Sequence, residues 1–119
     1  EAHQYLARAQ RGMTVKRIWH GWTTGENADT YEKLLREEVS VGIEAMKIAG
    51  LRRFEMMRRP HADEVEFVTI MEFDDVDAVK AFVGEDYEGC YVPDAARKVL
   101  KRFDERSQHY DLLEARSYA

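Results

Sequence analysis

Two histidines and one glutamate are the residues of this sequence best suited to proton transfer. His20 lies in the apolar segment 15–23, His109 follows the polar pair 107–108, and Glu66 lies in a run of alternating apolar and acidic residues. A neutral imidazole can both donate and accept a hydrogen bond near physiological pH. In an apolar cavity the imidazoles could act as acid and base on a phenol or enol. We therefore take His20 and His109 as candidate catalytic residues, with a purely structural role as the alternative.

Four residues are candidates for binding a substrate in the same pocket: Trp22, Glu66, Tyr87 and Arg58. Trp22 offers aromatic surface, although core packing is its simpler role. Tyr87 lies in a glycine-containing loop that could form a lid, or simply a surface loop. Arg58 could hold an anionic group in a bidentate manner, although pairing with glutamates across a hairpin is the more ordinary role.

Metal and cofactor chemistry find little support in the sequence. His20, His109 and Glu66 would make a 2-His-1-carboxylate set, but no ligand spacing favours one. Cys90 is the single cysteine and has no basic neighbour in sequence to activate it. Because phosphate-binding loops and nucleophile triads are also missing from the sequence, we predict no bound cofactor and no metal.

The segment 15–23 reads as a strand that needs cover on both faces. Side chains alternate along a strand, so Ile18, His20 and Trp22 share one face and Val15, Trp19 and Gly21 the other. Neither set is simply polar. A sheet with helices on one side only would leave one of these faces to water, so we expect a partner there.

The remaining elements follow from apolar spacing and from turn residues. We predict helices over 29–50, 75–83 and 93–106, and strands over 51–59, 64–73 and 109–116. This β-α-β-β-α-α-β order predicts an α+β fold, the ferredoxin-like split βαβ arrangement with the second helix doubled. Its antiparallel four-stranded sheet has the order 4-1-3-2, which would bring His20, Trp22, Glu66 and His109 to one cavity. The helix-free sheet face would pack against a second copy as a homodimer.

Composition and charge limit which binding partners and which cellular compartment we expect. The chain has 119 residues and a net charge of -5, so it lacks the basic excess expected for binding nucleic acid. No apolar run approaches the roughly 20 residues of a membrane span. A single cysteine excludes an intrachain disulfide and fits the cytoplasm. We expect residues 1–12 to be a leader or upstream extension and 13–119 to form a single domain.

Six segments of the sequence carry a resemblance to a known family: 17–23, 58–59, 64–73, 77–82, 91–93 and 107–110. Over roughly 13–118 the chain resembles the antibiotic-biosynthesis-monooxygenase-like families of the dimeric α+β barrel superfamily. The resemblance implies a homodimer that binds a small aromatic or polyketide-like molecule in an apolar pocket and oxygenates it without a cofactor. A non-catalytic ligand-binding or stress-associated dimer, or an isomerase using the same pocket, are the alternatives, because fold alone does not choose among activities.

The chain also departs from this family pattern. Phe73 stands where many oxygenase members carry a tryptophan, and Phe82 stands about where the haem-degrading members carry a histidine. The first strand also lacks their asparagine. A phenylalanine neither donates a hydrogen bond nor ligates iron, so we expect no haem binding by the usual residues. The case for oxygenation by the asparagine, tryptophan and arginine that oxygenase members use is weakened for the same reason.

Overall fold

One antiparallel sheet organises the structure, a computed structural model that describes residues 13–119. Its strand order is β2-β3-β1-β4, and β5 also pairs with β1. The strands are β1 (Val15–Thr23), β2 (Leu51–Pro60), β3 (Val65–Phe73), β4 (Arg102–Phe103) and β5 (Gln108–Asp111). Since β4 and β5 together occupy the far edge of β1, the predicted order 4-1-3-2 is confirmed. The predicted leader over residues 1–12 lies outside the described residues.

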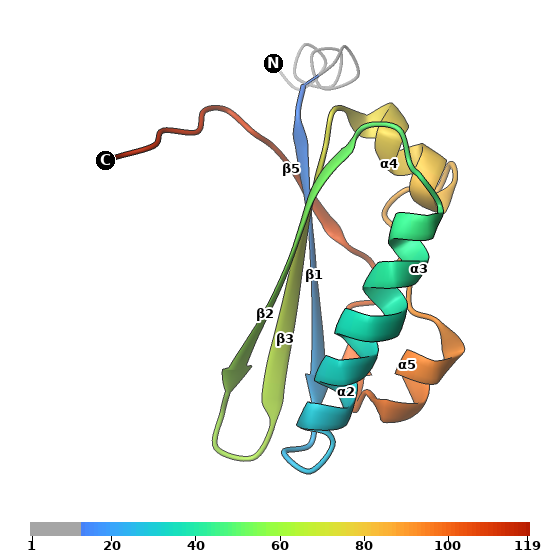
Figure 1. The fold of residues 1–119 in the computed structure, drawn as a ribbon, viewed down its shortest axis with the longest axis vertical. Coiled ribbons are helices and arrows are strands. Elements are labelled where there is room, and N and C mark those ends of the chain that lie inside the picture. Colours follow the sequence, from blue (N-terminus) through green and yellow to red (C-terminus); the bar gives the residue numbers. More distant parts are fainter. Residues whose placement is uncertain (1–12) are drawn as a thin grey trace.

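The helices all cover one face of this sheet (Figure 1). They are α2 (Ala28–Leu34), the π-helical turn η1 (Leu35–Val39), α3 (Ser40–Ala45), α4 (Val76–Val83) and α5 (Asp94–Val99). The first three follow one another without a break, and Leu35, Val39 and Ile43, spaced four apart, are buried. The predicted first helix is therefore confirmed in place, but it ends at Ala45 rather than near Gly50. None of the helices within residues 13–119 has the length and apolar character needed to cross a bilayer.

The end of the chain differs from the prediction in two places. α5 stops at Val99, because Leu100 is extended and the backbone N–H of Lys101 donates to the carbonyl oxygen of Trp22 at 2.7 Å. Phe103, predicted to belong to the helix, instead lies in β4. The predicted last strand over 109–116 is also too long, since β5 ends at Asp111 and the rest of the chain runs away from the body (Figure 1).

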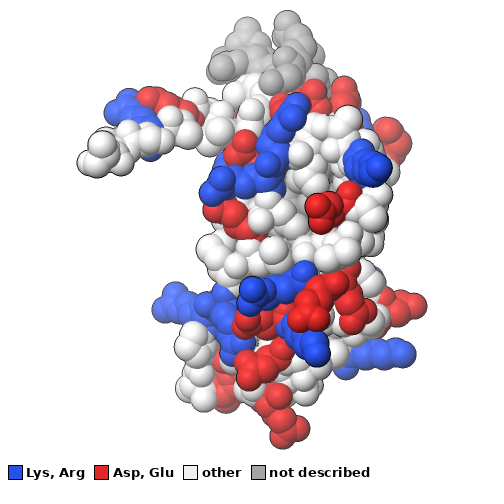
Figure 2. Space-filling model, in the orientation of Figure 1, with Lys and Arg blue, Asp and Glu red and all other residues white. Residues whose placement is uncertain are grey.

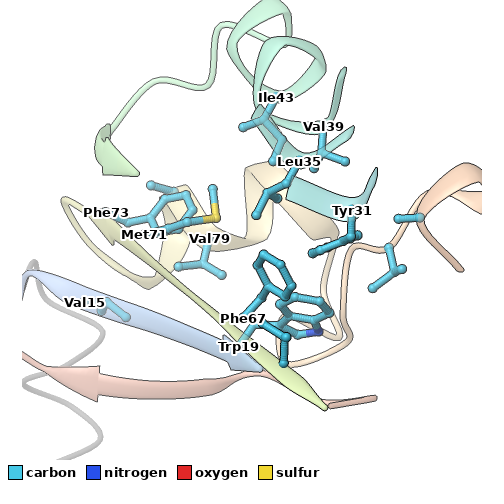
Figure 3. Packing of buried hydrophobic residues seen from close by; sticks show 14 of the residues in the cluster. Val15, Trp19, Tyr31, Leu35, Val39, Ile43, Phe67, Met71, Phe73 and Val79 are labelled. Carbon is cyan, nitrogen blue, oxygen red and sulfur yellow. The ribbon is translucent and has the colours of Figure 1, made fainter. Parts of the chain in front are cut away.

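The register of β1 and β3 sorts their side chains between the two faces. All nine residues of β1 pair with β3, from Val15 opposite Phe73 to Thr23 opposite Val65. Both strands alternate strictly between buried and half-buried residues. The buried set faces the helices and forms the core, in which Trp19, Phe67 and Tyr31 point into the same space (Figure 3). We call the other side, which no helix covers, the open face.

The connection from α4 to α5 crosses the helix-covered side and is tied down at its middle. Gly84 ends α4 with φ +98°, a conformation that glycine adopts without a steric penalty. The N–H of Cys90 donates to the carbonyl of Glu105, and the N–H of Ser107 donates to that of Glu88. An isolated bridge joins Gly89 and Arg106. These bonds hold the connection beside β5 and over the start of β1.

Candidate functional site

The two candidate catalytic histidines lie on opposite faces of the sheet. His109 pairs in register with Arg17, whose side chain is buried on the helix-covered side. His20 pairs with Val68 and belongs to the half-buried set on the open face. An odd separation along β1 places side chains on opposite faces, and Arg17 and His20 are three residues apart. The predicted common cavity for His20, His109 and Glu66 is therefore wrong.

His20 belongs instead to a polar and aromatic cluster on the open face. Its Nδ1 lies 2.7 Å from Oδ2 of Asp104, which also accepts the backbone N–H of His20 at 3.0 Å. Its ring stacks on Trp22, which the guanidinium of Arg102 covers at 3.9 Å. Glu66 pairs in register with Trp22, so the structure does bring His20, Trp22 and Glu66 to one face. No group of three potential metal ligands occurs among residues 13–119.

Arg58 and Tyr87 lie apart from this cluster, on the helix-covered side. The guanidinium of Arg58 is bonded to Glu32 at 2.7 Å and to Asp29 at 3.0 Å, so its partners are helix carboxylates rather than the hairpin glutamates. It lines a surface groove of about 420 Å³ next to β2. Tyr87 lies edge-on to His109, with ring centroids 5.1 Å apart. Of the six candidates, only Tyr87 and His109 are neighbours on this face.

An apolar cavity of about 40 Å³ lies between the sheet and the helices. Aromatic and aliphatic side chains, including Phe82, make most of its wall. The wall includes Arg17, Trp19, Tyr31, Val39, Tyr91, Pro93, Ala96 and Ser107. A space of this size holds a few water molecules, whereas sites for drug-sized ligands measure roughly 300–1,000 Å³. A larger ligand therefore requires part of the wall to move.

Arg17 supplies the charged end of this cavity. It is only 3% exposed, and its Nη1 donates to the carbonyl of Tyr87 at 2.6 Å and to Nε2 of His109 at 3.0 Å. Its Nη2 donates to the carbonyl of Gly89 at 2.7 Å. Burial lowers the pKa of Arg17 to about 10, while the nearby Cys90 acts in the opposite direction. The side chain is therefore still a cation at neutral pH.

His109 is a neutral imidazole whose acceptor nitrogen is already engaged. Burial, and then the positive charge of Arg17, lower the pKa of His109 to about 4. A guanidinium can only donate, so Nε2 of His109 must accept and its hydrogen must sit on Nδ1. The lone pair that a general base needs is thus occupied by Arg17. This arrangement suits His109 to positioning Arg17 better than to removing a proton from a substrate.

Two buried polar atoms near Arg17 have no hydrogen-bond partner among the described residues. They are Oγ of Ser107, a residue only 4% exposed that lines the cavity, and Nδ1 of His109. Buried polar atoms are normally hydrogen-bonded, and an exception calls for a water or a ligand. Ser107 thus adds a second polar group to the end of the cavity that Arg17 marks.

A surface groove of about 220 Å³ lies directly outside the cavity. The groove and the cavity share Val39, Tyr91, Pro93 and Ala96, so these residues form the partition between them. Val39 belongs to the π-helical turn η1, and such turns occur often at functional sites. The ring of Tyr91 packs on Phe82 with centroids 5.1 Å apart. Tyr91, rather than Tyr87, is therefore the tyrosine that lines both the groove and the cavity.

Sequence reasoning missed Arg17, Ser107, and the partition formed by Val39 and Tyr91. A signal for Arg17 was present, because a charged residue alternates with Val15 and Trp19 on the face that becomes the core. At Ser107 the sequence predicts only the end of the helix over 93–106. Val39 follows an ordinary helical spacing, and nothing in the sequence marks the π-turn.

Comparison with known proteins identifies the fold and no closer relationship. No family model matches the chain, and no curated protein sequence matches it. A solved structure described as a "putative antibiotic biosynthesis monooxygenase" from Bacillus cereus is similar with a TM-score of 0.61 and 11% identity, covering 90% of this chain and 100% of that one.

A second similar structure is a dimeric ferredoxin-like protein from an uncultured marine organism. Its TM-score is 0.54 at 10% identity, and the match covers 96% of this chain and 99% of that one. At such identities the likeness establishes the fold and nothing about activity. This chain therefore has an α+β ferredoxin-like fold similar to that of these two structures, as its sequence predicted.

Proposed function

We propose that this protein binds a small aromatic molecule in the cavity between its sheet and its helices. The observation that carries the proposal is the wall of that cavity, which is aromatic and aliphatic apart from Thr69 and the end formed by Arg17 and Ser107. Ligand sites commonly combine a mostly apolar lining with a few convergent polar groups. Trp19, Tyr31 and Phe82 offer ring surfaces against which an aromatic ligand can pack.

Access to the cavity runs through the outer groove. The interior space of about 40 Å³ is too small for an aromatic ring, and the groove of about 220 Å³ lies immediately beyond it. Rotation of Tyr91 would join the two spaces. Aromatic side chains can change rotamer without any change of fold, so this step requires no domain movement.

We further propose that the protein is a cytoplasmic homodimer that forms through the open face. Ile18, Val68 and Ile70 lie at the centre of that face and are only half-buried in one chain, while Met57 is 45% exposed. An ion pair between Lys16 and Glu72 at 2.9 Å lies toward one end of the same face. An apolar centre with a charged margin is typical of a protein interface. A protein of similar fold is described as dimeric, which supports the proposal.

Binding can be tested by calorimetry with 1-naphthol and a variant that narrows the partition. Val39→Phe adds volume between the groove and the cavity and should weaken binding at least about tenfold, because overpacking of a filled site is costly. Val41→Phe is the matched control, since Val41 lies two residues away and is 52% exposed. The proposal fails if 1-naphthol shows no saturable binding, or if both variants bind it equally well.

Oxygenation of the bound molecule is the second candidate function. It is favoured by the shared fold with a protein described as a monooxygenase and by a cavity wall that is mostly apolar. In such a reaction the deprotonated substrate gives electrons to oxygen. 1-Naphthol and O2 would yield 1,4-naphthoquinone and water, with one oxygen atom retained as the new carbonyl. A water-excluding site protects the intermediates.

Oxygen consumption distinguishes the enzyme from the non-catalytic binding protein. We expect one O2 to be consumed per quinone formed, with the rate falling in Val39→Phe and unchanged in Val41→Phe. If 1-naphthol binds saturably and no oxygen is consumed, the binding function stands. Oxygenation of naphthols is then ruled out.

A further inference from the structure

We infer that the ligand of the interior cavity carries an oxyanion, a carboxylate or phenolate on the aromatic ring, and that the guanidinium of Arg17 binds it. This inference rests on the proposed binding function and specifies its substrate class. The structural basis is a buried cation that forms no ion pair with a carboxylate of the described residues.

The surroundings of Arg17 do not neutralise its charge. Its three hydrogen-bond partners are two backbone carbonyls and the imidazole of His109, and it forms no ion pair with any carboxylate of residues 13–119. Arg52 and Arg58, by contrast, are more exposed, and each is paired with a carboxylate. A buried charge is costly unless an opposite charge accompanies it. An anionic group on the ligand would offset the energetic cost of burying the charge of Arg17.

The guanidinium also has hydrogen-bond donors to spare. Five N–H groups are present in an arginine side chain. Two on Nη1 and one on Nη2 are used by Tyr87, His109 and Gly89, which leaves the Nε hydrogen and one Nη2 hydrogen without a partner among the described residues. Two remaining donors on one planar group can serve the two oxygens of a carboxylate, or one phenolate oxygen.

Ser107 provides an independent observation at the same end of the cavity. Its hydroxyl oxygen is buried, lines the cavity and has no hydrogen-bond partner among residues 13–119. A hydroxyl can donate to an oxyanion, so Ser107 can complete the group of donors around it. Two polar side chains, one charged and one unpartnered, thus converge on the same part of a mostly apolar wall.

The matched pair 1-naphthoate and 1-naphthamide tests the inference, because the two differ in charge and little in shape. Calorimetry on the full chain at pH 7 should show naphthoate binding about tenfold to a hundredfold more tightly, the effect of one charge-assisted hydrogen-bonded pair. Ser107→Ala should weaken naphthoate more than naphthamide. Arg17→Met should remove the preference, whereas Arg52→Met, which alters an exposed guanidinium, should keep it.

The outcomes separate this inference from the proposed function. Equal affinity of the wild-type protein for both compounds would overturn the inference and leave cavity binding intact, and this comparison needs no variant to fold. A preference for naphthoate that persists in folded Arg17→Met would also overturn it, since the anion would then bind elsewhere. The proposed function itself would be overturned if none of the three compounds binds: 1-naphthol, 1-naphthoate or 1-naphthamide.

Discussion

Nη1 of Arg17 donates a hydrogen bond to Nε2 of His109 across 3.0 Å, between neighbouring strands. The pair places a cation against an imidazole that must stay neutral, because protonation of His109 would remove the acceptor and set two positive charges side by side. The bond therefore fixes both the tautomer of His109 and the position of Arg17 in the cavity wall.

The first prediction concerns pH. The pKa of His109 falls from 6.5 to about 4 on folding, so between these values the unfolded chain binds more protons than the folded one. The contribution of His109 to the free energy of unfolding is fully present above pH 6.5 and is lost as the pH falls toward 4. Urea unfolding at several pH values should show this loss.

His109→Gln provides the control for the pH prediction. The glutamine amide can still accept a bond from Arg17 but does not titrate, so the pH dependence between 6.5 and 4 should become shallower. A variant whose pH dependence matches that of the wild-type protein would show that His109 titrates normally in the folded state.

A second prediction addresses the open face. Ile70→Lys places a charge at the centre of the proposed interface and should weaken self-association at least about a hundredfold, since an unpaired buried charge costs roughly 3 kcal/mol or more. Analytical ultracentrifugation would report the change. Val41→Lys, on the exposed side of α3, should leave the association unchanged. Wild-type protein that sediments as a monomer at micromolar concentration would rule out the dimer.

A third prediction contrasts two glycines. A Cβ at Gly21 would overlap the indole ring of Trp19 and approach Leu100 within 3.1 Å, so Gly21→Ala should lower the free energy of unfolding by about 1–3 kcal/mol. Gly42 lies within α3 with nothing within 4 Å of an added Cβ. Gly42→Ala should therefore stabilise by about 0.5–1 kcal/mol. Denaturant unfolding that shows both changes to be neutral would contradict the packing of Trp19 across Gly21.

A fourth prediction tests the start of α4. The carboxylate of Asp75 accepts the N–H of Ala78 at 2.9 Å, as an N-cap does. Asp75→Ala should cost about 1 kcal/mol in the free energy of unfolding, whereas Asp75→Asn, which keeps an acceptor, should cost a few tenths at most. An equal loss in both variants would assign the effect to charge rather than to capping.

Alternation made the two faces of the sheet predictable from the sequence. Val15 and Trp19 in β1 share one face, as do Phe67 and Phe73 in β3, as alternation predicted, and the structure shows that this face is the buried one. The strand order followed from the order of elements alone. The alternation and the order of elements predict the fold correctly because each depends only on local spacing and on one apolar face.

The candidate site depended instead on pairing that no local spacing reveals. His109 lies on the helix-covered face because its partner across the strands is Arg17, and a shift of one residue would have reversed its face. The helical spacing of Ala96, Val99 and Phe103 predicts a longer helix than the structure shows. α5 ends at Val99, because the backbone N–H of Lys101 donates to the carbonyl of Trp22 in β1.

The bridge between Gly89 and Arg106 closes residues 89–106 into a loop that contains α5 and the two-residue strand β4, which pairs with β1. A helix of six residues is not stable in isolation, so α5 depends on that closure and on its packing. We expect the loop to open as one cooperative unit, with the amide hydrogens of α5 exchanging with solvent deuterium at a common free energy. The same opening would withdraw Tyr91 and Ala96 from the cavity wall. Occupancy of the cavity should therefore be visible as slower exchange throughout this loop, even at amides that never meet the ligand.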